Sequence, residues 1–532
     1  MLGTNMLARS AMMAAGALWL GQIGIAQQRL QVKVDPRFEL ISVVEMLSAQ
    51  GFGGLVSLDD TSYRRDVLAW FGTYRAHPAI TGLVELATHG YDHDAPMGTA
   101  VCLSSPPELD LEADPQECSA GRAGGAGSLN HWLDQLRDFA RKSDFMTFFR
   151  AHAGLYSMIE ESTRSRIPRD YAADLECYFG VKQASFHLVP APLLTGGNYG
   201  PSRRHPNGTL DLYGIVSSTG QSKGIPQFGT VQELRYQAWH EFAHSFINPE
   251  MIALAPLVDR SHKLMLPTEG AMRSQAYDQW MIVVYEHVVR AVTTRLAFRE
   301  LGKEEGEAAL LYEKSRGFAY VESLADALKE YEQQRGQYAT FHDFAPRLLE
   351  VLEALSSRDL PKEFYAVPYT GTMASAGQAG GPTVLIVPTG EADPATQQRI
   401  LEYVKKVQAQ FFAGSAILTD EQALAKDLSA FRVNVYGTPA GNKWLARYRN
   451  SIPALALLEH RSEAGPLRLI ATMPNPKNPT RGVAVYTATM AGAVVGIHNL
   501  FCNDNWAYVV GKDQTVLTSG VYSRQDGHWV VR

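Results

Sequence analysis

The chain has 532 residues, of which 45% are hydrophobic and 20% are charged, and its formal net charge is −6. This composition excludes a disordered or fibrous protein and predicts more than one folded domain. Lysine and arginine are not in excess, which argues against a nucleic-acid-binding protein, because such a protein would carry a basic footprint.

The first 26 residues have the pattern of a secretory signal peptide. Arg9 precedes an apolar run from Ala11 to Leu20, and small residues close the segment at Gly24 and Ala26. The run is short for a bilayer span, so we expect cleavage near Ala26 rather than retention as an anchor. The sequence therefore predicts an exported protein, periplasmic or extracellular, with no stable membrane span after cleavage.

The four cysteines are interpreted in the light of this predicted export. Cys102 and Cys118 bracket a proline-rich acidic loop, and we expect a disulfide between them in an oxidising compartment. In the chain-entropy model, closing this loop stabilises the fold by about 3 kcal/mol. Cys177 and Cys502 lie in different candidate domains, and we expect both to be buried thiols.

Residues 27–369 have mostly helical periodicity, with apolar residues at spacings of three and four. Two short apolar runs broken by glycine, proline and asparagine, at 186–194 and 210–218, predict strands. We therefore expect one α+β domain here, mostly helical with a small sheet.

The segment 370–383 consists mostly of small, uncharged residues and is rich in glycine. We expect it to be a flexible linker with nothing to bury. Beyond it, residues 384–532 contain β-branched runs, the first three of which alternate with helical patterns. This alternation predicts a smaller α/β domain with a partly parallel sheet.

The segment QELRYQAWHEFAHSFINPE, residues 232–250, reads as one helix. Thr230 and Glu233 form a capping-box pattern at its start, and Asn248 and Pro249 supply a stop signal at its end. These signals predict a helix of about 16 to 18 residues.

On this helix, His240 and His244 are one turn apart on one face, and Glu241 lies beside the first histidine. H-E-x-x-H at this spacing predicts two imidazole ligands for one zinc ion and a carboxylate that accepts a proton from the attacking water. The alternative is two hydrogen-bonded core histidines beside a paired Glu241. Apolar residues surround the helix on nearly all sides, and buried histidines need partners, which favours the metal.

The stretch HEFAHSFINP resembles the active-site helix of zincin metallopeptidases. Together with VDPRFELISVV, YRAHPAI, LTGGNYGP, YEHVVRAV and RGFAYVESLADAL, it makes residues 31–360 similar to a bacterial family of secreted zincin-like proteins, domain-of-unknown-function family 4932. The resemblance implies a zincin-like metallopeptidase fold and a zinc cofactor, and it leaves the C-terminal domain out.

A catalytic zinc keeps three protein ligands and one open position. Resemblance to the glutamate-type zincins, or gluzincins, in which a following helix supplies the third ligand, favours Glu286 in the apolar segment 281–292. Glu269 and His287 are lesser candidates.

A different interpretation of segment 281–292 remains open. Several polar residues fall on one stripe, as on a solvated helix face, and an ion pair between Glu286 and Arg290 at i, i+4 would explain both residues. The stripe consists of Gln279, Glu286, His287, Arg290 and Thr294.

Hydrolysis also needs a hydrogen-bond donor to the developing oxyanion. The sequence does not choose among five candidates, which are Tyr199, Tyr277, Tyr285, His287 and Arg290. Residues 196–200, GGNYG, are interpreted first as a turn and second as a sheet edge that could pair with an extended peptide.

We therefore expect an exported zinc metallopeptidase in which His240, His244 and Glu286 hold zinc and Glu241 is the general base. Its substrate would be a peptide or protein. Two other functions remain open: a catalytically inactive zincin-fold binding module, and a zinc hydrolase of non-peptide amides or esters.

Overall fold

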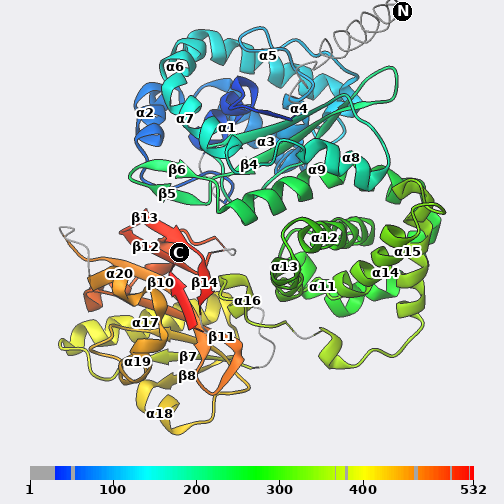
Figure 1. Cartoon of the computed structure of the whole chain (residues 1–532). Coiled ribbons are helices and arrows are strands. Elements are labelled where there is room, and N and C mark those ends of the chain that lie inside the picture. Colours follow the sequence, from blue (N-terminus) through cyan, green and yellow to red (C-terminus); the bar gives the residue numbers. More distant parts are fainter. Residues whose placement is uncertain are drawn as a thin grey trace, which may run out of the picture.

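The computed structural model describes residues 30–48, 54–365, 367–377, 382–459, 465–503, 506–525 and 528–531. The predicted signal peptide, residues 1–26, lies outside these residues. About half of the chain is helical, and a separate sheet-rich domain follows the mostly helical region, as expected (Figure 1). None of the described helices has the length and apolar character needed to cross a membrane.

The N-terminal part is built on a four-stranded sheet in the order β1-β2-β4-β3. Three of its strands are parallel, and β3 is an antiparallel strand at one edge. A β5–β6 hairpin follows and leads into the next helix. The strands are β1 (Leu30–Val32), β2 (Ser185–Ala191), β3 (Ser202–Arg204), β4 (Leu210–Ser217), β5 (Gly220–Ser222) and β6 (Ile225–Gln227).

Helices cover both faces of this sheet. Phe38 of α1 (Pro36–Leu47) packs on Tyr213 of β4, with ring centroids 6.0 Å apart. Phe242 of α9 (Val231–Ala253) packs on Phe186 of β2 at 5.4 Å. Phe186 is paired with Leu212, so Phe186 and Tyr213 point to opposite faces of the sheet. Burial on both faces explains why β2 and β4 are nearly continuous apolar runs.

Among the described residues of this part, eight α-helices lie between β1 and β2 in the sequence, and one follows β6. They are α1 (Pro36–Leu47), α2 (Ser62–Phe71), α3 (Pro78–Ala87), α4 (Asp94–Ala100), α5 (Ala126–Lys142), α6 (Phe145–Ala151), α7 (Ala153–Arg164), α8 (Tyr171–Phe179) and α9 (Val231–Ala253).

Helix α9 begins as predicted but is longer than expected. Thr230 caps it, and the capping box with Glu233 is present. The predicted end at Asn248 and Pro249 is wrong, because the helix continues to Ala253 and has 23 residues in all. Met251, beyond the proline, is fully buried, and this packing outweighs the hydrogen bond that a proline removes.

A helical bundle lies on the other side of α9 from the sheet (Figure 1). Its central helix α12 is buried nearly all round and contacts α9, α13 and α14. The bundle consists of α10 (Ala255–Asp259), α11 (Met265–Arg273), α12 (Trp280–Glu300), α13 (Lys303–Ser315), α14 (Val321–Gln333) and α15 (Phe341–Ser356).

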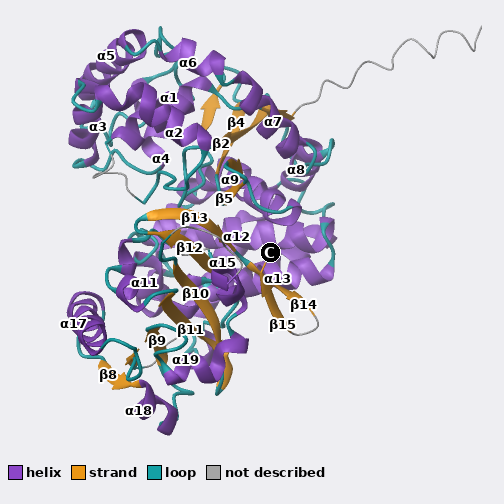
Figure 2. Cartoon of the chain, turned by 90° about the vertical axis from the view of Figure 1, so that its left-hand side faces the viewer, coloured by secondary structure: helices purple, strands orange, loops and turns teal. Residues whose placement is uncertain are grey.

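The C-terminal domain contains a seven-stranded mixed sheet in the order β13-β12-β10-β11-β9-β7-β8 (Figure 2). The predicted parallel part is confirmed, since β8, β7, β9 and β11 run parallel, while β10, β12 and β13 pair antiparallel. The strands are β7 (Thr383–Val387), β8 (Ala416–Thr419), β9 (Arg432–Tyr436), β10 (Arg468–Asn475), β11 (Asn478–Ala488), β12 (Tyr508–Lys512) and β13 (Thr515–Gly520), with the hairpin β14 (Tyr522–Gln525) and β15 (His528–Val531). Its helices are α16 (Met373–Gly377), α17 (Pro394–Phe411), α18 (Asp420–Ala425), α19 (Lys443–Tyr448) and α20 (Ala456–Glu459).

The expectation that segment 370–383 has nothing to bury is wrong for its first half. Residues 373–377 form α16, and Ser375 and Ala376 are buried. The backbone of Met373 donates to the carbonyl of Trp506 at 2.8 Å. Small side chains allow this close packing on the sheet. A segment rich in small residues can either pack closely or be a flexible linker, and composition alone does not distinguish the two. Residues 378–381 lie outside the described part.

The two parts of the chain meet at the edge strand β13. The backbone of Asp60 donates to Val516 at 3.2 Å, and the Gln221 side chain donates to the carbonyl of Leu517. The β5–β6 hairpin lies beside β13 in both views (Figures 1 and 2). The hairpin covers a strand edge that would otherwise be open to pairing with other chains, and it directly precedes α9.

The predicted disulfide between Cys102 and Cys118 is present. The expectation of two further buried thiols is wrong for Cys177, which is exposed, while Cys502 is partly buried. Cys177 lies near the end of α8, where its neighbours Tyr178 and Phe179 point into the core and Cys177 points out.

Helix α1 carries two glutamates, Glu39 and Glu45, that are almost fully buried. Burial raises the pKa of each carboxyl from 4.5 to about 8, although a hydrogen bond from Tyr63 opposes the shift at Glu39. Both carboxyls are therefore neutral in the folded protein near neutral pH, whereas in the unfolded chain they ionise above pH 4.5.

We predict that this difference makes stability depend on pH. Because the folded pKa is raised, the contribution is fully present below about pH 4.5 and is lost as pH rises toward 8, by about 1.4 kcal/mol per pH unit for each group. The double variant Glu39→Gln/Glu45→Gln should lose this slope in urea unfolding between pH 5 and 8. The exposed control Glu108→Gln should keep it, and an unchanged slope in the double variant would contradict the assignment.

Candidate metal centre

One face of α9 carries four polar side chains at successive spacings of four residues, Tyr236, His240, His244 and Asn248. This spacing places them in a line along the helix. The line faces the central helix α12 of the bundle, which contacts α9 along its length. Polar groups on a face that packs against another helix must find their partners within the interface.

The two histidines converge with a glutamate of α12. The Nε2 atoms of His240 and His244 are 3.2 Å apart. Glu286 places Oε2 at 3.7 Å from His240 Nε2 and Oε1 at 3.6 Å from His244 Nε2. Among the described residues, no other group of three or more histidine, cysteine, aspartate or glutamate side chains is arranged to hold a metal ion.

These distances fit a metal ion. A tetrahedral ion with bonds of about 2.0 to 2.1 Å separates its ligand atoms by about 3.3 Å, close to the three distances here. His244 Nδ1 lies 3.2 Å from Asn248 Oδ1. In the tautomer with the proton on Nδ1, this contact leaves the lone pair of Nε2 free to face the cluster. Burial, then Arg290 and His244, holds the pKa of His240 well below its usual value, which keeps this imidazole neutral.

Glu241 is buried on the same helix, with 4% of its surface exposed. The alternative of two hydrogen-bonded histidines beside a paired Glu241 fits the histidines, whose Nε2 atoms are within hydrogen-bond distance of each other. It does not fit Glu241, because within the described residues no hydrogen bond or ion pair to its carboxyl is present. Burial, and then the charge of Glu286, raises its pKa well above the usual value, while Arg290 opposes the shift. An unpartnered buried carboxyl beside a ligand cluster is typical of a functional site.

The segment 196–200 serves both as a turn and as a sheet edge. Gly196 has a φ of 74°, as a turn requires. The backbone of Tyr199 exchanges hydrogen bonds with Ile215 of β4 at 3.0 and 2.8 Å, which extends the sheet edge formed by β3. Gly200 has no positive φ, but a Cβ there would overlap the carbonyl oxygen of Glu241. The glycine thus lets the sheet edge lie directly against α9 at Glu241.

The two lesser candidates for the third ligand do not join the cluster. Glu269 is on α11, where it accepts from Arg273 at 2.8 Å on the surface. His287 is buried, but its Nδ1 lies 2.7 Å from the carbonyl of Val283 and its ring packs on Phe318. His287 follows Glu286 directly on α12, so His287 points away from α9 whereas Glu286 faces α9.

The solvated-stripe interpretation is wrong for four of its five residues, because Glu286, His287, Arg290 and Thr294 are buried. Gln279, the N-cap of α12, is exposed. The predicted i, i+4 ion pair nevertheless exists, with Arg290 Nη2 at 2.9 Å from Glu286 Oε2. Glu286 therefore belongs both to the cluster with His240 and His244 and to the ion pair with Arg290.

The structure distinguishes among the candidate oxyanion donors. His287 points away, and Arg290 is engaged with carboxylates. Tyr277 accepts from Arg290 at 3.3 Å, and the ring of Tyr285 lies 6.3 Å from that of His244. Tyr277 and Tyr285 therefore lie beside the cluster with hydroxyl groups that can donate. Tyr199 lies on the sheet edge, close enough to Glu241 for their charges to interact, and also stays a candidate.

The sequence missed two partners of the cluster, Tyr236 and Glu313. The Tyr236 hydroxyl donates to Glu313 Oε1 at 3.0 Å, and Glu313 on α13 is fully buried. A signal for Tyr236 existed, because it extends the i, i+4 line of His240 and His244 by one turn. Glu313 lies in a segment with several other glutamates, and no pattern singles it out.

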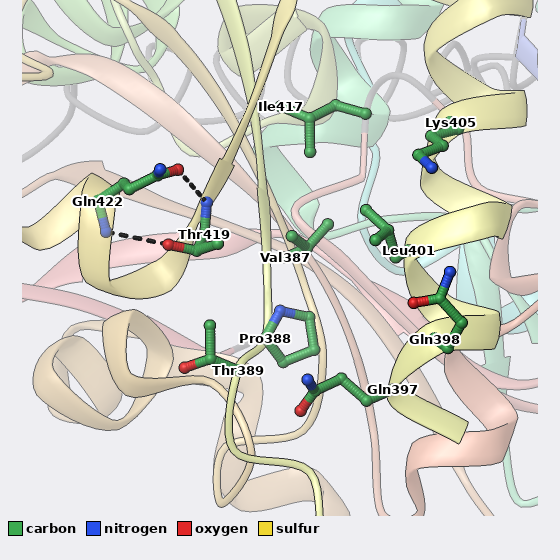
Figure 3. A pocket seen from close by; sticks show the side chains of 10 residues that line it. All are labelled: Val387, Pro388, Thr389, Gln397, Gln398, Leu401, Lys405, Ile417, Thr419 and Gln422. Atoms are coloured by element: carbon green, nitrogen blue, oxygen red, sulfur yellow. Dashed lines mark hydrogen bonds between the residues drawn. The ribbon is translucent and has the colours of Figure 1, made fainter. Parts of the chain in front are cut away.

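The C-terminal domain carries a hollow of about 360 Å³ between α17 and the carboxyl ends of β7 and β8 (Figure 3). Its floor is apolar, and its rim consists of amides, hydroxyls and Lys405. Thr419 and Gln422 on this rim are engaged with each other in the capping box of α18. The described residues that line this hollow include no carboxylate, histidine or cysteine.

A family model described as Domain of unknown function (DUF4932) matches residues 30–351. This agrees with the family resemblance of residues 31–360 found in the sequence. No curated protein and no solved structure matches the chain.

We predict that Gly200→Ala destabilises the protein by about 1 to 3 kcal/mol, because the added Cβ meets backbone of α9 that cannot rotate away. The matched control is Gly127→Ala in α5, where a Cβ meets nothing within 4 Å. That substitution should be neutral or stabilising by up to about 1 kcal/mol. Urea unfolding measures both, and equal midpoints for the two variants would contradict the close approach.

Proposed function

The chain belongs to the family described as Domain of unknown function (DUF4932), and because that description assigns no activity, we propose from the geometry of the site that it is an exported zinc-dependent peptidase. The observation that carries the proposal is the convergence of His240, His244 and Glu286 beside the unpartnered carboxyl of Glu241. Two neutral nitrogen donors and one carboxylate form the ligand set of a catalytic zinc site with an open position.

His240 and His244 from α9 and Glu286 from α12 would hold the ion. When bound, zinc would polarise the carbonyl of the substrate as a Lewis acid and make water a better nucleophile at neutral pH. The three side chains are between 8% and 13% exposed, so the site is sheltered but reachable. This shelter strengthens the electrostatic interactions within the site.

Glu241 would act as the general base. It lies on α9 next to a ligand, it is buried, and nothing in the described chain competes for its carboxyl. It would accept a proton from the attacking water and pass that proton to the nitrogen of the leaving amine as the peptide bond breaks. General acid–base catalysis of this kind contributes about 10²- to 10⁴-fold to a rate.

The sheet edge beside α9 supports a peptide or protein as substrate. Tyr199 and β3 form the terminal strand of the order β1-β2-β4-β3, and Gly200 brings this edge against Glu241. An extended peptide can pair with such an edge through its backbone, independently of its sequence. A scissile peptide bond held there would lie next to the proposed base.

The disulfide between Cys102 and Cys118 supports export, because disulfides persist in oxidising compartments. It agrees with the signal-like pattern of residues 1–26. We therefore propose that the protein acts in the periplasm or outside the cell.

We predict that Glu241→Gln retains zinc but loses hydrolysis of a mixed peptide substrate by about 10²- to 10⁴-fold. Glutamine keeps the shape of the side chain and cannot accept the proton. The control Glu269→Gln removes a surface carboxylate paired with Arg273 and should change neither property. Elemental analysis gives the metal content, and the cleavage assay is run with chelator and with zinc added back.

The possible results of this experiment distinguish the proposed peptidase from the two other functions. Full cleavage by Glu241→Gln would reject the assigned base. Zinc without any cleavage by the unmodified protein would favour an inactive binding module, and cleavage of small amides or esters alone would favour a non-peptide hydrolase.

A further inference from the structure

Arg290 lies one turn after Glu286 on α12, and we propose that it is a positioning residue that fixes the Glu286 carboxylate for the metal. This inference rests on the proposed zinc site. A carboxylate on a helix can rotate about its side-chain bonds, and an ion must then order it on binding. A partner that holds one of its oxygens beforehand removes this cost.

The guanidinium of Arg290 binds two carboxylates at the same time. Nη2 donates to Glu286 Oε2 and Nη1 donates to Glu313 Oε2, each at 2.9 Å. Its Cζ lies 4.0 Å from the centre of the Phe318 ring, which supports the guanidinium plane from one side. The fork of an arginine matches this task, whereas a lysine offers one compact charge.

Contacts beyond Arg290 return to the helix that carries the histidines. Glu313 Oε1 accepts from the hydroxyl of Tyr236, which lies one turn before His240 on α9. The sequence of contacts from Tyr236 to Glu313, Arg290 and Glu286 therefore joins α9, α13 and α12. It fixes the position of Glu286 relative to the helix whose imidazoles complete the cluster.

Burial makes these contacts obligatory. The Arg290 side chain is 4% exposed, Glu286 is 8% exposed and Glu313 is fully buried. Charges so far from water are strongly destabilising unless they are paired, so the guanidinium has no alternative position in solvent. Glu286 keeps Oε1 on the side of His244 while Oε2 is held by Arg290.

The positive charge of Arg290 and its positioning of Glu286 should affect metal binding in opposite directions. A positive charge beside a metal site repels the cation, so removal of Arg290 would strengthen zinc binding if charge were its whole contribution. Positioning predicts weaker binding instead. The sign of the change therefore distinguishes the two roles.

The test compares Arg290→Lys and Arg290→Met with the unmodified full-length protein by zinc competition against a chromophoric chelator. We expect both variants to bind zinc about 10- to 100-fold more weakly, the range for loss of a partner that orients a ligand. At saturating zinc, peptide hydrolysis by Arg290→Lys should recover, in contrast to Glu241→Gln.

Arg295 provides a matched control on the same helix. It also forms a two-bond pair with a carboxylate, Glu332, at 3.0 and 2.6 Å, but that carboxylate is not at the site. Arg295→Lys should leave zinc affinity unchanged. Equal loss of affinity in Arg290→Lys and Arg295→Lys would overturn the inference, because it would reflect general damage to α12.

Unchanged or stronger zinc binding by either Arg290 variant would also overturn it. If these variants do not fold, Tyr236→Phe removes only the hydroxyl that holds Glu313, and it should weaken zinc binding severalfold; unchanged affinity there would contradict the inference. Failure of the unmodified protein to bind zinc would overturn the proposed function as well. Zinc binding that is indifferent to Arg290 overturns the positioning role alone.

Discussion

The site depends on the burial of α9 between a sheet and a helical bundle. Its aromatic and aliphatic side chains pack on β2 and β4, and its line of polar residues faces α12. Polar groups in such an interface need partners there, because little of their surface is in contact with water. His240 and His244 converge on Glu286 in an arrangement that could hold a metal ion. Glu241 is buried on the same helix, and within the described residues its carboxyl has no hydrogen bond or ion pair.

The charges around this cluster form one connected unit. Arg290 lies between Glu286 and Glu313, and Glu313 returns to α9 through Tyr236. Three helices thereby share one buried network, in which removal of any member leaves a charge or a hydroxyl unsatisfied. The C-terminal domain contacts the hairpin that leads into α9, so the start of this helix is supported by the second domain as well.

Local patterns predicted the local structure. The capping box at Thr230, the alternation of strands and helices at the start of the C-terminal domain and the loop-closing disulfide all follow from residues near one another in sequence. The continuation of α9 past Pro249 could not be predicted, because it depends on packing around Met251. Likewise the i, i+4 spacing predicted the two histidines, whereas Glu286 needed a family resemblance. Glu313 and the close approach at Gly200 arise from the tertiary fold, which no local pattern encodes.

In the proposed site, one zinc ion is held between α9 and α12. Anomalous diffraction at the zinc edge, from crystals of the full chain, tests this most directly. We expect one anomalous peak per chain, about 2.0 to 2.1 Å from the Nε2 atoms of His240 and His244 and within bonding distance of a Glu286 oxygen. A zinc-saturated crystal with no peak there, or with zinc held by other side chains, would contradict it.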